Sequence, residues 1–70
     1  MRYREAARRL LALGCVEVPR QGDGSHRKWH NPVTNRSTVL PDWRGKDLKL
    51  GTIKGAVRQL GLEWADFENA

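Results

Sequence analysis

The chain has 70 residues, of which 39% are hydrophobic and 30% charged, so it has room for one small folded domain and not for two. It contains no apolar run long enough to span a bilayer, and its single cysteine excludes an intramolecular disulfide. All 13 basic residues lie in the first 60 positions, which hold only five acidic ones. This excess of positive charge indicates a polyanionic partner, most commonly nucleic acid, although charge alone fits a merely solvated surface equally well.

The first predicted element is an amphipathic helix over residues 2–13, followed by Gly14 as its C-terminal cap. Its predicted buried stripe consists of Tyr3, Ala6, Ala7, Leu10, Leu11 and Leu13. Arginines are interspersed with these apolar residues rather than placed before them, which is not the pattern of a signal peptide. We therefore expect residues 1–70 to form a single cytoplasmic domain that does not contact a membrane.

Three short β-strands are predicted next, over residues 15–18, 25–30 and 36–40. The first two alternate in polarity and the third is rich in β-favouring residues. Pro19, the pair Asn31–Pro32 and Pro41 end the strands. Such short strands joined by tight turns form an antiparallel meander.

The alternation of the second strand places Ser25, Arg27 and Trp29 on one side and His26, Lys28 and His30 on the other. Trp29 is the only large apolar residue of this strand, so we expect its side to pack against the helices. The strand residues expected to accompany it there are Val16, Val18 and Val39. The two histidines and Lys28 then project from an uncovered face.

A second helix is predicted between Thr52, as its N-cap, and Gly61. Its buried stripe consists of Ile53, Ala56, Val57 and Leu60. The residues after it form a short helical turn that carries Trp64 and Phe67. The predicted fold class is therefore α+β: helix, three antiparallel strands, helix, with both helices on one face of the sheet and the other face open to solvent or a partner.

His26 is the first catalytic candidate, because an imidazole can both accept and donate a proton at physiological pH. RNA supplies its own nucleophile, the 2′-hydroxyl, so a base and a cation suffice for transesterification without a metal ion. Lys28 lies about 6.6 Å along the same face and can hold a phosphate, whereas His30 is about 13 Å away and is expected to be a surface residue or a peripheral contact. On pattern alone, an exposed strand histidine is more often solvated than catalytic.

Further residues are candidates for contacts with an RNA backbone, through amide donors or positive charge. The predicted RNA-binding residues are Gly24, Ser25, Arg27, Lys28, Lys46 and Lys54. Trp43, in an otherwise polar loop, is either a stacking platform for a base or a plug over the edge of the core. One cysteine and two histidines give no recognisable zinc spacing, so no metal ion and no cofactor are expected.

The segment "GSHRKWHNP", a β run ending at Pro41, then "GKDLKLGTIKGAVRQLGL" and "WADF" together resemble the HicA (YcfA-like) toxins of bacterial type II toxin–antitoxin systems. The resemblance covers nearly the whole chain in order. It implies a fold like that of double-stranded-RNA-binding domains, with the order α-β-β-β-α. It also implies a metal-independent ribonuclease that cleaves mRNA and stops translation, with His26 as its catalytic residue and a cognate HicB antitoxin as its partner.

The sequence departs from the family pattern at two positions. Trp43 stands where many relatives carry a histidine shortly after the proline that ends the third strand, and Arg27 stands where a histidine often follows the Gly-Ser-His piece. Two other kinds of protein therefore stay open at this point. One is an RNA-binding module without catalysis, and the other is an interaction protein that pairs its open sheet face or edge with another polypeptide.

Overall fold

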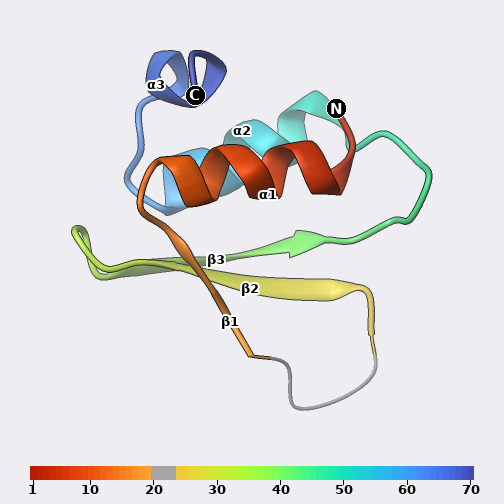
Figure 1. Ribbon diagram of the computed structural model, residues 1–70, viewed down its shortest axis with the longest axis horizontal. Helices are drawn as coiled ribbons and strands as arrows, with labels where there is room; N and C mark the ends of the chain where they lie inside the picture. The colour runs from red at the N-terminus through yellow and green to blue at the C-terminus, as the bar shows by residue number, and fades with distance from the viewer. Residues whose placement is uncertain (20–23) are drawn as a thin grey trace.

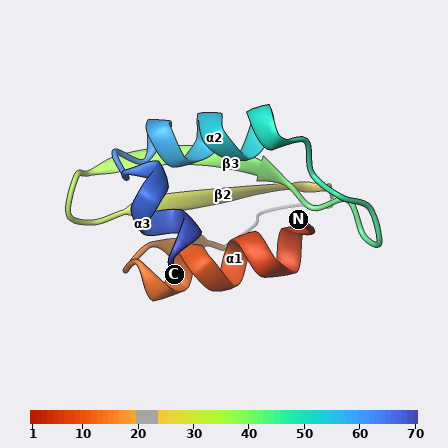
Figure 2. The same cartoon turned by 90° about the horizontal axis from the view of Figure 1, so that it is seen from above.

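The structure, a computed structural model, describes residues 1–19 and 24–70. The helices are α1 (Tyr3–Ala12), α2 (Leu50–Gln59) and α3 (Trp64–Glu68), and the strands are β1 (Val16–Val18), β2 (His26–Asn31) and β3 (Arg36–Pro41). The strands form an antiparallel sheet in the order β1-β2-β3, and α1 and α2 lie side by side on one of its faces (Figure 1 and Figure 2). This arrangement confirms the predicted α+β fold with one uncovered sheet face.

Helix α1 ends as predicted, at a glycine in the left-handed conformation. Gly14 has a φ of 88°, which side chains with a Cβ rarely adopt. Its amide donates to the carbonyl of Leu11, and the amide of Cys15 donates to the carbonyl of Leu10. These two bonds satisfy carbonyls that the last turn leaves without a partner inside the helix. Gly61, with a φ of 73°, closes α2 in the same way.

The prediction that Thr52 caps α2 is wrong, because the helix begins at Leu50. Lys49 occupies the N-cap position with φ −66° and ψ 140°, and it forms no side-chain cap hydrogen bond. The amide of Leu48 donates to the carbonyl of Met1 at 2.8 Å, so the chain is already held against the N-terminus there. This tertiary bond orients the chain so that the helix begins three residues earlier than the local capping signal indicates.

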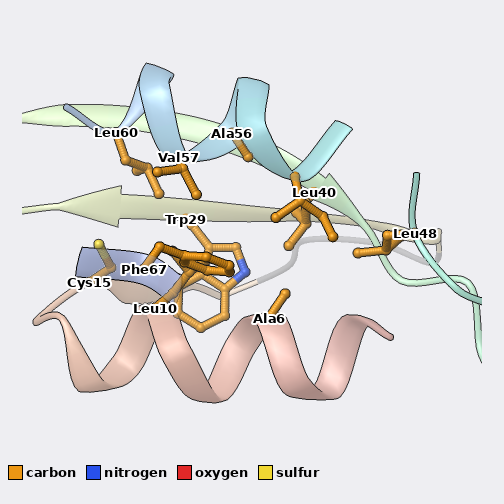
Figure 3. Close-up of a cluster of buried hydrophobic side chains, with 11 residues drawn as sticks. Ala6, Leu10, Cys15, Trp29, Leu40, Leu48, Ala56, Val57, Leu60 and Phe67 are labelled. Atoms are coloured by element: carbon orange, nitrogen blue, oxygen red, sulfur yellow. The ribbon is translucent and has the colours of Figure 1, made fainter. Parts of the chain in front are cut away.

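The core is built around Trp29, which is 1% exposed and reaches from β2 toward α1 (Figure 3). Leu10 of α1 and Phe67 of α3 lie next to its indole ring. The complete buried cluster is Ala6, Leu10, Cys15, Trp29, Leu40, Leu48, Ile53, Ala56, Val57, Leu60 and Phe67. The predicted stripe of α2 is thus buried in full. In α1 the stripe is narrower than predicted, since Leu11 is 59% exposed.

Val16, Val18 and Val39 lie on the uncovered face, contrary to the prediction. Directly paired residues of an antiparallel ladder point to the same face, and Glu17 is the residue paired with Trp29. Each valine is instead paired with a residue of the uncovered face. Val16 pairs with His30, and both Val18 and Val39 pair with Lys28. The predicted alternation of β1 is confirmed, but which residues face the helices depends on the register with β2, which the pattern of a three-residue strand does not fix.

None of the helices in the described ranges combines the length and the hydropathy that a bilayer crossing requires.

The short helix α3 is held in place from both sides by α1 and α2. Arg9 of α1 donates to the carbonyls of Phe67 and Glu68, at 3.2 and 2.8 Å. Phe67 itself is 1% exposed and stacks on Trp64, with ring centroids 5.3 Å apart. The C-terminal segment is therefore an integral part of the core.

Replacing Phe67 by alanine is expected to lower the free energy of unfolding by about 3–5 kcal/mol, because it empties a fully buried aromatic site. Chemical denaturation measures this change. Val33→Ala is the matched control, since Val33 is 88% exposed and its loss should change stability by less than about 0.5 kcal/mol. Equal denaturation midpoints for the two variants would contradict the packing of α3 described here.

Candidate functional site

The uncovered face of the sheet carries a row of basic side chains on its central strand. His26, Lys28 and His30 alternate along β2 with the residues that face the helices. The residues beside them on the outer strands are Val16 and Val18 of β1 and Ser37 and Val39 of β3. Val16 is 48% and Val39 54% exposed. The face therefore combines positive charge with accessible apolar surface.

His26 is the first residue of β2, and its side chain is exposed. Its partner across the ladder is Pro41, the last residue of β3. The backbone N–H of Asp42 donates to the carbonyl of Ser25, which continues the pairing one residue beyond each strand. The imidazole is thus presented at the end of the sheet on a backbone held by hydrogen bonds.

Lys28 and His30 differ in how they relate to His26. Lys28 is exposed on the same face, about 6.6 Å along the strand, between two valines. His30 lies about 13 Å from His26 at strand rise, and its Nδ1 is 2.9 Å from Oγ of Ser37. The structure therefore brings Lys28 close to His26, and it places His30 toward the other end of the strand in a local hydrogen bond.

Arg27 points to the opposite side of the sheet, toward the helices. Its guanidinium lies 3.2 Å from the Glu17 carboxylate and 3.0 Å from that of Asp42. It also lies over the ring of Tyr3, 5.8 Å from the centroid. The side chain is 20% exposed. Arg27 is thus engaged in internal ion pairs and does not share a face with His26.

The hydroxyl of Tyr3 joins this ion-pair cluster to the core. It donates to the Glu17 carboxylate at 2.7 Å and accepts from the indole N–H of Trp29 at 3.1 Å. Burial and the hydrogen bond to Glu17 together raise the pKa of the Tyr3 phenol above its ordinary value. One hydroxyl therefore connects α1, β1 and β2 behind the site.

The other predicted contacts lie apart from the uncovered face. Lys54 is on the outer side of α2, with its Nζ 5.3 Å from the centre of the Trp64 ring. Lys46 is in the β3–α2 loop, where its amide donates to the carbonyl of Trp43 at 3.0 Å. Trp43 is 40% exposed and does not belong to the core cluster. Of the glycine-rich turn, Gly24 and Ser25 are exposed, whereas Gly22 lies outside the described residues.

Metal-ligating side chains do not gather anywhere in residues 1–19 and 24–70, where no three His, Cys, Asp or Glu could hold an ion together. Cys15 is 1% exposed within the core, and burial raises the pKa of its thiol. The groups that the described residues offer on the uncovered face are imidazole, ammonium, hydroxyl and backbone.

Comparison with known proteins places the chain among bacterial toxins. The model of the family described as HicA toxin of bacterial toxin–antitoxin matches residues 3–62. A protein of Pseudomonas fluorescens (strain Pf0-1) named probable mRNA interferase HicA is 43% identical over 63 residues, which are 90% of this chain and 98% of that protein. The chain belongs to the HicA toxin family. The resemblance drawn from the sequence motifs is thereby confirmed, and the HicA match includes both His26 and Lys28.

Sequence reasoning missed two groups of residues in this HicA fold, namely the ion-pair partners of Arg27 and the arginines of α1. Glu17 and Asp42, the partners of Arg27, are 10 and 15 positions away in the chain, and only the strand register brings them to it. The arginines of α1 received no role, although Arg4 and Arg8 are one helical turn apart and so share a side of the helix. The four-residue spacing of Arg4 and Arg8 is the sequence signal that indicates a basic side of this helix.

The phenol of Tyr3, the single tyrosine, is expected to resist ionisation in the folded protein. Because its folded pKa is raised, the stabilisation it gives is complete below its unfolded pKa, about 10, and is lost as pH rises further toward the folded value. Phenolate absorbance should therefore appear at higher pH in native protein than in urea, and the free energy of unfolding should fall above about pH 10. Tyr3→Phe is the control: because it lacks the phenol, its free energy of unfolding should fall less steeply above about pH 10. Coincident titration curves in native and unfolded protein would contradict the hydrogen bonding described.

Proposed function

We propose that this HicA family member is the toxin of a type II toxin–antitoxin system and acts as a metal-independent endoribonuclease that cleaves mRNA and so stops translation. The name of the Pseudomonas fluorescens relative, mRNA interferase, supports this activity. The observation that carries the proposal is the exposed His26 on an uncovered sheet face, two residues from Lys28, in a chain of this family.

His26 acts on the 2′-hydroxyl of the RNA. Its imidazole accepts the proton of that hydroxyl while the 2′-oxygen attacks the adjacent phosphorus. The bond from phosphorus to the 5′-oxygen breaks, and that oxygen takes up a proton from the imidazolium or from water. The products are a 2′,3′-cyclic phosphate and a 5′-hydroxyl end.

Lys28 and the glycine–serine turn hold the reacting phosphate. The ammonium of Lys28 stabilises the negative charge that develops on the phosphoryl oxygens. Gly24 has no side chain, and both it and Ser25 are exposed next to His26, so a phosphate can come close to the backbone there. Arg27 supports this site from the helix side of the sheet, because its ion pairs with Glu17 and Asp42 join β1 to the chain after β3. Arg27 is thus a positioning residue in this proposal, and Lys46 and Lys54 are more distant contacts for the RNA backbone.

The partner of this toxin is a cognate HicB-like antitoxin that covers the uncovered face. Val16 and Val39 flank the basic row and are 48% and 54% exposed. Accessible apolar side chains beside a charged site are what a protein partner buries. An antitoxin seated there blocks access to His26 without altering it.

The proposal predicts that His26→Ala lowers the rate of RNA cleavage by about 10²- to 10⁴-fold, as expected for loss of a general base. Cleavage by purified protein in the presence of EDTA, and growth arrest on expression, measure the effect. His30→Ala is the matched control, since His30 lies on the same strand and face but in a local bond with Ser37. It should retain most of the activity.

Three outcomes separate the alternatives. Full cleavage by a folded His26→Ala variant would remove His26 from the mechanism. Cleavage abolished by EDTA and restored by a divalent ion would contradict the metal-independent chemistry. Steeply salt-dependent RNA binding without cleavage by the wild-type protein would instead identify an RNA-binding module. Detection of the cyclic phosphate end would support the transesterification route.

A further inference from the structure

A groove lies between α1 and the β3–α2 loop, on the helix side of the sheet. Its volume is about 580 Å³. It is lined by Arg2, which caps α1, by the α1 residues Tyr3, Arg4, Ala7, Arg8 and Leu11, and by the loop residues Asp42, Trp43, Arg44 and Gly45. We call it the α1 groove. None of the α1 residues was assigned a function from the sequence.

The α1 groove carries a net positive charge that other protein groups leave largely unbalanced. Four arginines line it against one carboxylate, Asp42, which is already paired with Arg27. Among the described residues, Arg2, Arg4 and Arg44 form no ion pair, while Arg8 pairs with Glu5 beside the groove. Three guanidinium groups thus remain available for an anionic ligand.

Trp43 supplies the aromatic surface of the α1 groove. It is 40% exposed and also lines a second hollow with Arg44 and Lys46. A turn presents it: the amide of Lys46 donates to its carbonyl, and Gly45 has a φ of 73° at the position where a type II turn requires a positive φ. The indole of Trp43 thus lines two open hollows, belongs to no core cluster and has ring surface accessible for stacking.

The α1 groove and the proposed reaction site lie at the same end of the molecule. The starts of α1 and β2, the end of β3 and the loop toward α2 all lie at the right-hand end of Figure 1. Pro41 is the ladder partner of His26, so their Cα atoms are about 5 Å apart, and Trp43 follows two residues later, at most about 7 Å farther. A single nucleic-acid strand can therefore reach both sites around this end of the sheet.

We propose that the α1 groove binds the single-stranded segment of RNA that flanks the cleavage site. One unpaired base stacks on Trp43, and the guanidinium groups of Arg4 and Arg44 hold the phosphates on either side of it. The proposal rests on the proposed ribonuclease function and names a substrate class for it, namely unpaired RNA.

The chemistry of the groove favours an unpaired strand over the other polyanions. A base in a duplex keeps both its faces stacked inside the helix, so it cannot lie on an indole, whereas every unpaired base offers a π-face. An acidic peptide would satisfy the arginines but would leave the Trp43 face without a stacking partner. Arginine and tryptophan together are the residues that bind a flexible strand through its phosphates and bases.

The test measures the affinity of the full-length protein for a short mixed-sequence 2′-O-methyl RNA strand, which lacks the nucleophile and cannot be cleaved by the proposed route. Trp43→Ala is expected to weaken binding by about 5- to 150-fold, and Trp43→Phe to restore most of it. The variant with both Arg4→Ala and Arg44→Ala should lower the slope of log affinity against log salt by about 1.4. The same RNA annealed into a blunt duplex should bind more weakly than the single strand.

Two controls accompany these variants. Arg36→Ala removes an exposed arginine at the other end of β3 and should leave the affinity unchanged. In a Trp64→Phe background, RNA should quench the tryptophan fluorescence, because Trp29 is buried and the signal of an accessible indole then comes from Trp43. Adding Trp43→Phe should abolish the quenching. Circular dichroism verifies that each variant is folded.

Wild-type affinity in both Trp43→Ala and the double arginine variant, or equal affinity for single strand and duplex, would overturn the α1 groove as the binding site. If the wild-type protein still cleaves natural RNA in that case, the proposed function stands and only the groove assignment fails. A wild-type protein that neither binds nor cleaves RNA would overturn both.

Discussion

The burial of Trp29 between the sheet and the helices determines which way every residue of β2 points. A fully buried tryptophan needs a partner for its N–H, and the phenol on α1 provides one at 3.1 Å. Once Trp29 is fixed toward the helices, strand geometry turns His26 and Lys28 to the uncovered face. The exposure of the candidate catalytic histidine is thus a consequence of burying the one large apolar residue of its strand.

The ion-pair cluster of Arg27, Glu17 and Asp42 neutralises the positive charge on the helix side of the sheet. Arg27 is the one arginine of β2, and two carboxylates together with the face of Tyr3 compensate it. Those carboxylates are consequently not available to neutralise Arg4 or Arg44. A small basic protein can hold a polyanion only where its cations are not consumed by its own acids, and the ion pairs of Arg27 separate these two uses.

The two faces of the sheet therefore have different roles in the proposed function. The uncovered face offers His26 and Lys28 between exposed valines, a surface suited both to chemistry and to burial by a protein partner. The helix side holds the core and, at its edge, the α1 groove. Because the groove lies on the helix side of the sheet, an antitoxin on the uncovered face can block the proposed reaction site without occupying the groove.

The sequence by itself determined the element order, the fold class, the glycine ends of the helices and the alternation that sets His26 apart from Arg27. These features depend on interactions between residues close in the chain, which periodicity and capping rules describe. Only the tertiary structure decided that Glu17 faces inward while the valines of β1 face outward, that α2 starts at Leu50, and that arginines of α1 meet Trp43 across a groove. Each of these follows from strand register or from packing between distant segments, and a one-residue change of register reverses every side chain of a strand. No local pattern contains that information.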